Sequence, residues 1–262
     1  MPNQFKMKKG IKYGTCAICE ETCILTFEHI PPKAAFNNKP SRVYSMENIL
    51  EKTKDSKQIP KSFEGLHYSD RQKGYGDYLL CAKCNNMTGH LYAPAYINFN
   101  NSILKLIADN YDDYMKATGL QLDARIKPLN FAKQVLSMFC CSYPKIKKQY
   151  PIIQKLILNK DMNIQDGNYP FQLLMFLLTP DSIPGSTGPI ALLMNDGRID
   201  AKFEIDFPPL GFQIYESKTN NNAMDITSFL TFKYDETADI NSLLPIYKKD
   251  TIFPVKTLGT LR

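Results

Sequence analysis

The sequence predicts an α+β protein with a small metal-stabilised module first, helices next and a mostly antiparallel β region last. Three observations support this fold class. Two Cys-x-x-Cys pairs lie in the first third of the chain, apolar residues at helical spacing follow, and strand-like runs begin near residue 170. We therefore expect three parts, covering residues 1–100, 101–165 and 166–262.

Composition places the chain among ordinary globular proteins. Of its 262 residues, 44% are hydrophobic and 22% are charged, so a sizeable core is possible. No apolar run approaches the roughly 18–20 residues that span a bilayer. The basic start lacks the apolar stretch of a secretory signal. We expect a cytoplasmic protein without a membrane partner.

Charge is unevenly distributed along the chain. Residues 1–160 contain 24 Lys and Arg against 13 Asp and Glu, whereas residues 161–262 contain 8 against 13. The first 160 residues are thus the part that would attract a polyanion such as a nucleic acid. A solvated lysine-rich surface is the other interpretation.

The seven cysteines indicate a metal site rather than a disulfide framework. Their number is odd, and nothing suggests secretion. Cys16/Cys19 and Cys81/Cys84 share the spacing that lets two thiolates of one tight turn grip a single ion. Two such pairs complete a tetrahedral shell of four soft ligands, which favours zinc.

The N-terminal part is expected to contain two strands around these pairs. "CILTFEHI" reads as a strand that Pro31-Pro32 ends, and "YGDYLL" reads as a second strand leading into Cys81. Between them, residues 45–54 form a plausible short helix. After the second pair we expect a helix capped by Asn85 or Asn86, made short or irregular by Gly89 and Pro94.

The middle of the chain is expected to be helical. "NSILKLIADNYDDYMKA" has apolar residues at helical spacing, and "PIIQKLIL" is another candidate helix. "PLNFAKQVLSMFCCSY" opens with Pro128, which suits a first helical turn. Cys140 and Cys141 lie in this run and are expected to be buried as small hydrophobic residues.

The last part is expected to be β. Four runs read as strands, and Asn195-Asp196-Gly197 is a hairpin signal. Alternation at Ala201, Phe203, Ile205 and Phe207 directs one face of its strand inward. The runs are "FQLLMFLL", "PIALLMNDGRIDAKFEIDF", "GFQIYES" and "ITSFLTFKY".

Glu28-His29 lies between the two cysteine pairs, and Asn85-Asn86 follows the second pair. This order, "CAIC…FEHIPP…LLCAKCNN", resembles the zinc-containing HNH (ββα-metal) endonuclease family over about residues 13–96. The resemblance implies a ββα-metal module with structural zinc, in which His29 is the general base. It also implies that Glu28 and Asn85 hold a catalytic Mg²⁺ or Mn²⁺, and that the protein belongs to a mobile element or a phage-defence system.

The residue types suit phosphodiester hydrolysis. An imidazole accepts a proton near neutral pH, and a hard cation prefers carboxylate and amide oxygens. The sequence departs from the family pattern in two respects. The segment between His29 and Cys81 is longer than a compact hairpin requires. The asparagine that orients the histidine would fall near Gly76-Asp77, and the candidates to replace it are Asn85, Asn86 and the residues between His29 and Cys81. Its absence is the feature that supports a non-catalytic alternative.

Further candidates lie around this motif. His90 follows Asn86 by four residues, so the two would share a helical face, and His90 is a candidate cation ligand. Basic residues with tyrosines between them could follow a nucleic-acid backbone. These residues are Lys33, Arg42, Arg71, Lys73 and Lys83.

The leading hypothesis is a metal-dependent HNH-type endonuclease acting on DNA, with RNA as the other candidate substrate. The alternative is a non-catalytic zinc-ribbon module that binds nucleic acid, in which His29 is structural. A protein–protein adaptor is a third hypothesis, which predicts no salt-sensitive binding to nucleic acid. The acidic C-terminal region would choose the target, bind a protein partner or mediate self-association.

Overall fold

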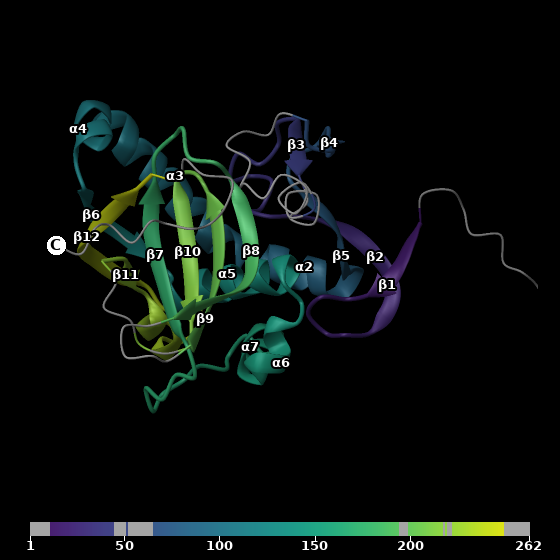
Figure 1. The fold of residues 1–262 in the computed structure, drawn as a ribbon. Helices are drawn as coiled ribbons and strands as arrows, with labels where there is room; N and C mark the ends of the chain where they lie inside the picture. The colour runs from purple at the N-terminus through teal and green to yellow at the C-terminus, as the bar shows by residue number, and fades with distance from the viewer. Residues whose placement is uncertain are drawn as a thin grey trace, which may run out of the picture.

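The computed structural model describes residues 11–44, 51, 65–193, 199–216, 218 and 222–248 (Figure 1). Within them, a small N-terminal hairpin with its helix lies beside a larger sheet that is backed by helices. The expected helix over residues 45–54 lies outside the described residues, except for Glu51, which is helical. The expected turn at residues 195–197 also lies outside them.

The N-terminal sheet has three antiparallel strands in the order β1 (Lys12–Thr15), β2 (Thr22–His29) and β5 (Gly76–Cys81). Both strands expected around the cysteine pairs are therefore present. β2 ends at His29, directly before Ile30 and the two prolines, which cannot donate backbone hydrogen bonds to a ladder. A separate two-stranded sheet pairs β3 (Ser41–Tyr44) with β4 (Tyr68–Arg71).

Helix α2 (Ala82–Leu91) follows β5 without a loop. Its N-cap is Cys81, whose Sγ accepts a hydrogen bond from the backbone N–H of Cys84 at 3.3 Å. The expectation that Asn85 or Asn86 caps this helix is wrong, because the thiol of Cys81 already serves there and both asparagines lie inside the helix.

The middle part contains helices as expected, and two of them open with proline. The run expected as one helix over residues 101–117 is divided at Asn110 between two helices, the first of which begins at Ala93. Pro128 and Pro151 occupy first-turn positions, where a missing N–H costs no intrahelical bond. A break at Tyr92 separates α2 from the next helix. The bounds are α3 (Ala93–Asp109), α4 (Tyr111–Lys116), α5 (Pro128–Ser142), α6 (Ile146–Gln149) and α7 (Pro151–Leu158).

The large sheet has the strand order β6-β12-β7-β10-β9-β8, with β11 paired to β7. All neighbouring strands are antiparallel except β12 and β7, which are parallel. This agrees with the expected mostly antiparallel region. The bounds are β6 (Gly119–Ile126), β7 (Gln172–Leu178), β8 (Gly185–Leu193), β9 (Ile199–Phe207), β10 (Leu210–Tyr215), β11 (Met224–Asp225) and β12 (Ala238–Tyr247).

Two features of this sheet differ from the sequence-based expectation. "ITSFLTFKY" was expected to be a strand, but Thr227–Thr231 forms the 3₁₀ helix η1, which turns Phe229 and Leu230 into the core beside α5. In addition, β6 and β12 were not predicted as strands. They pair with each other although more than 100 residues separate them.

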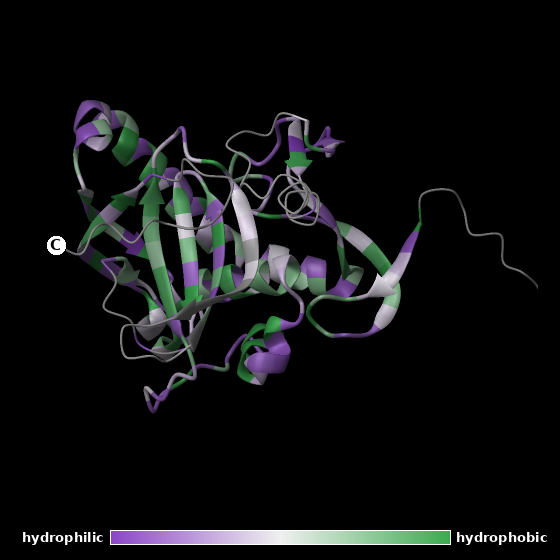
Figure 2. Ribbon diagram, in the orientation of Figure 1, coloured by the Kyte–Doolittle hydropathy of each residue, from purple (hydrophilic) through white to green (hydrophobic). Residues whose placement is uncertain are grey.

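The core lies between the large sheet and the helices behind it. β7 is buried along its whole length and is almost continuously hydrophobic (Figure 2), and α5 lies behind the sheet, in contact with β8 and β9 (Figure 1). Cys140 and Cys141 of α5 are buried, as expected. The same hydrophobic cluster continues into the N-terminal module through Ile18 and Leu80.

Strand β9 is buried on both faces. Phe203 and Ile205 face the core as the alternation predicts. Lys202 and Glu204, which alternate with these residues, are buried as well, because their side chains form an ion pair at 2.7 Å that satisfies both charges. Among the described residues, no helix is both long and apolar enough to cross a membrane.

Candidate metal centre and adjoining cleft

The four cysteines of the two Cys-x-x-Cys pairs form one cluster. Cys16 and Cys19 lie in the turn between β1 and β2, while Cys81 and Cys84 lie where β5 meets α2. Their sulfur atoms all lie within 4.8 Å of one another, and Cys19 Sγ is 3.9 Å from Cys81 Sγ. Four thiolates around zinc at about 2.3 Å stand about 3.8 Å apart, so the cluster can bind a metal ion such as zinc.

Two backbone hydrogen bonds hold the first cysteine turn in place. The N–H of Cys16 donates to Glu21 O, and that of Ala17 donates to Leu79 O, which ties the first turn to β5.

A hydrogen bond from the Cys84 thiol lowers the pKa of Cys16 to about 4, so the cluster favours a thiolate there.

The first cysteine turn also contacts helices α6 and α7. The carbonyl of Ile18 accepts hydrogen bonds from Lys147 Nζ at 3.1 Å and from Gln154 Nε2 at 2.7 Å. Lys147 Nζ lies 3.2 Å from a carboxylate oxygen of Glu20 as well. The first cysteine turn is thereby fixed to the middle part of the chain.

A cleft of about 160 Å³ lies beside this cluster. It contains both members of the Glu28-His29 pair at the end of β2, together with Asn85 of α2. The ladder between β2 and β5 has an irregular register at Thr26/Phe27, just before this pair. The remaining lining residues are Phe27, Pro32, Lys33, Gly89, Ala93 and Gln134.

Glu28 is half-buried in this cleft, and burial raises the pKa of its carboxyl group to about 7. The physical cause is desolvation, since moving a carboxylate out of water disfavours its charged form. A cation bound beside Glu28 would reverse this effect by stabilising the carboxylate. The position therefore suits an oxygen ligand of a divalent cation.

The ring of His29 is anchored by a hydrogen bond between its Nε2 and the carbonyl of Lys73, at 3.0 Å. A carbonyl can only accept, so this bond fixes the tautomer with the proton on Nε2. Nδ1 then carries the lone pair and can accept a proton. The ring also packs edge-on against Phe27, with centroids 4.9 Å apart.

The backbone that holds His29 is itself clamped by Asn37. Its Nδ2 donates to the carbonyls of Pro31 and Tyr75, and its Oδ1 accepts from the N–H of Tyr75, all at 2.7 Å. Between Lys73 and Tyr75 lies Gly74, with φ of +98°, where an added Cβ would stand 2.2 Å from Asn37 O.

Asn37 belongs to the segment between His29 and Cys81, one of the places where the sequence left room for an orienting asparagine. Asn85, another of those candidates, donates through Nδ2 to Thr26 Oγ1 at 2.9 Å and to Phe27 O at 3.1 Å. Both N–H groups of Asn85 are thus engaged with β2, and its carbonyl oxygen is the atom able to bind a ligand.

The remaining candidates are distributed around the cleft. Lys33 lines it with an exposed side chain, whereas Asn86 and His90 are exposed on α2 and are not among the lining residues. Lys73 and Lys83 are exposed, and Lys73 meets His29 only through its carbonyl.

Two of the basic candidates are already paired with acidic groups. Arg42 lies 3.6 Å from Asp70 and over the ring of Tyr68, and Arg71 lies 3.1 Å from Asp77. Such pairing leaves less positive charge for a polyanion. Of the predicted basic residues, only Lys33 lines the cleft.

Sequence reasoning missed two residues that bear on this cleft. Asn37 lies in a segment without a recognisable pattern. Gln134 comes from α5, about 100 residues beyond His29, and its place in an apolar helical run gives no signal of a site. No family model, curated protein or solved structure matches the chain.

Proposed function

We propose that the protein is a metal-dependent endonuclease of the HNH type, which hydrolyses phosphodiester bonds in DNA at the cleft between β2 and α2. The observation that carries this proposal is the convergence of Glu28, His29 and Asn85 on one cleft beside a four-cysteine cluster. A structural zinc in that cluster would hold the turn between β1 and β2 against the junction of β5 and α2.

In this proposal His29 is the general base. Its Nδ1 takes a proton from the attacking water, while the bond from Nε2–H to Lys73 O keeps the ring oriented and stabilises the imidazolium that forms. The two hydrogen bonds between Asn37 and the backbone of Tyr75 keep the nearby carbonyl of Lys73 in place.

Glu28 and the carbonyl oxygen of Asn85 would hold Mg²⁺ or Mn²⁺ in the cleft. When bound, such a cation neutralises charge that builds on the phosphate and assists departure of the leaving oxygen. The donor set fits a hard cation, because it combines a carboxylate with an amide oxygen. The exposed ammonium group of Lys33 at the cleft would attract the phosphate of the substrate.

The test is cleavage of supercoiled plasmid in Mg²⁺ or Mn²⁺ by wild type, His29→Ala and Glu28→Gln, each shown to contain the same amount of zinc. We expect nicked or linear product from the wild type and a loss of at least about a hundredfold in rate for each variant. His67 is an exposed histidine outside the cleft, so His67→Ala is the matched control and should cleave at the rate of the wild type.

Equal cleavage by wild type and His29→Ala would refute the assignment of the general base. If neither protein cleaves but both retain the plasmid in a salt-sensitive manner, the non-catalytic zinc-ribbon module becomes the better explanation.

A further inference from the structure

Gln134 is an unusual residue for its place in the fold. It lies in α5, whose residues are buried from Pro128 to Cys141, and only 1% of its surface is exposed. Among the residues that the structure describes, its Oε1 has no hydrogen-bond partner. An unpaired buried carbonyl costs free energy, so such an atom in a native protein calls for a ligand or a water.

This unpaired amide lines the same cleft as Glu28, His29 and Asn85. One turn earlier on α5, Asn130 donates through Nδ2 to the carbonyl of Leu91 at the end of α2, at 3.0 Å. Residues four apart share a helical face, so the face that carries Gln134 is the face that meets α2. Helix α5 therefore presents this amide to the cleft from the face that packs against α2.

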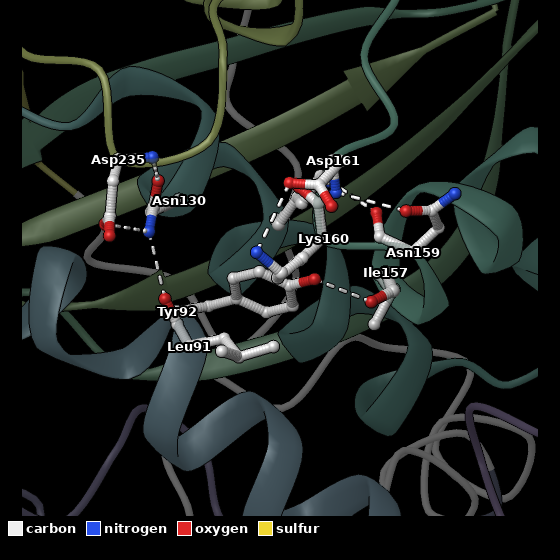
Figure 3. A network of polar contacts seen from close by, with 9 residues as sticks. Leu91, Tyr92, Asn130, Ile157, Asn159, Lys160, Asp161 and Asp235 are labelled. Atoms are coloured by element: carbon white, nitrogen blue, oxygen red, sulfur yellow. Dashed lines mark hydrogen bonds and ion pairs between the residues drawn. The ribbon is translucent and has the colours of Figure 1, made fainter.

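The position of α5 against α2 is fixed by a network of polar contacts (Figure 3). Asn130 also exchanges hydrogen bonds with Asp235, at 3.1 and 3.0 Å, and Tyr92 donates its hydroxyl to Ile157 O at 2.8 Å. These contacts bind the junction of α2 and α3 to α5, α7 and the segment before β12. A rigid junction of this kind preorganises an amide for a ligand.

We propose that the carboxamide oxygen of Gln134 is a ligand of the divalent cation, alongside Glu28 and Asn85, bound directly or through one of the waters of the cation. This inference rests on the proposed function, because it concerns the same cation. Hard cations accept neutral amide oxygens as ligands, and the free acceptor of Gln134 is such an oxygen. The cation site then requires α5 as well as the N-terminal module.

The test is Mn²⁺ binding to the full-length, zinc-loaded protein, measured by titration calorimetry and by electron paramagnetic resonance of free Mn²⁺, with thermal unfolding in parallel. Gln134→Met keeps the volume and removes the unpaired oxygen. We expect its Mn²⁺ affinity to fall about tenfold or more, while its Tm without Mn²⁺ stays equal or rises.

Gln154→Met is the matched control, because Gln154 donates its amide to Ile18 O and lies outside the cleft. This variant should have a lower Tm and an unchanged Mn²⁺ affinity. Gln134→Glu keeps the shape and supplies a carboxylate oxygen, so at pH 8 it should bind Mn²⁺ at least as tightly as the wild type.

The outcomes separate the two proposals. If the wild type and Gln134→Met bind Mn²⁺ equally, the role of Gln134 is refuted while the cation site stands. A lower Tm with unchanged affinity in Gln134→Met would show that the amide is structural. If the wild type binds no Mn²⁺, both the cation site of the proposed function and the role of Gln134 fail.

Discussion

The ring nitrogen Nε2 of His29 lies 3.0 Å from the backbone carbonyl of Lys73, a residue 44 positions later in the chain. This bond determines which nitrogen of the imidazole carries the proton. It also makes the orientation of His29 depend on the short turn over residues 73–75, and on whatever holds that turn in place.

Asn37→Ala is expected to lower activity through this turn. The substitution removes three hydrogen bonds of 2.7 Å, and at about 1 kcal/mol for each bond it should reduce the free energy of unfolding by about 2–3 kcal/mol. The turnover rate should fall while plasmid affinity changes little. Plasmid cleavage kinetics and urea denaturation measure both effects.

The neighbouring Asn38 is exposed, so Asn38→Ala is the control and should match the wild type. A variant Asn37→Ala with normal turnover would show that the turn orients His29 without help from Asn37.

Gly74→Ala is expected to destabilise the protein more than Gly167→Ala. Both glycines have positive φ, at +98° and +67°, where a Cβ costs about 1 kcal/mol or more. At Gly74 the Cβ would also stand 2.2 Å from Asn37 O, whereas nothing lies within 4 Å at Gly167. Denaturation midpoints of the two variants measure the difference, and equal losses would contradict the predicted clash.

Removal of the metal should make the four cluster thiols reactive and leave the thiols of Cys140 and Cys141 protected. In zinc-loaded protein we expect alkylation at the half-buried Cys23 only, and chelation should add the four cluster cysteines. Cys140 and Cys141 should remain unmodified, because burial raises the pKa of Cys140 to about 12 and that of Cys141 well above its usual value.

Mass spectrometry of alkylated peptides measures this pattern. Cys81→Ser should lose the metal and expose the other three cluster thiols without chelator. Protection of the cluster after chelation would contradict a metal site.

Asn130→Leu is expected to loosen the junction between α2 and α5. The change leaves Leu91 O and the N–H of Asp235 without their amide partner, and we expect a loss of about 2–4 kcal/mol in the free energy of unfolding. Hydrogen exchange should increase at the C-terminal end of α2. Tyr92→Phe, which removes the single bond to Ile157 O, should cost only about 1 kcal/mol.

Much of the molecule follows from patterns that are local in the sequence. Two Cys-x-x-Cys pairs predicted the cluster, because each pair is set by one turn. Pro128 and helical spacing predicted α5, and the apolar run before Pro31 predicted β2. The N-cap of α2 could not be read in this way, because a cysteine of the four-cysteine cluster occupies that position.

Tertiary structure alone decided the pairing of β6 with β12, the burial of both faces of β9 and the surroundings of His29. Asn37 and Gln134 carry no local signal, because their importance comes from partners about 40 to 100 residues away. Sequence periodicity reports which face of an element is apolar. It does not report which distant backbone carbonyl or cleft a polar side chain will meet once the elements pack.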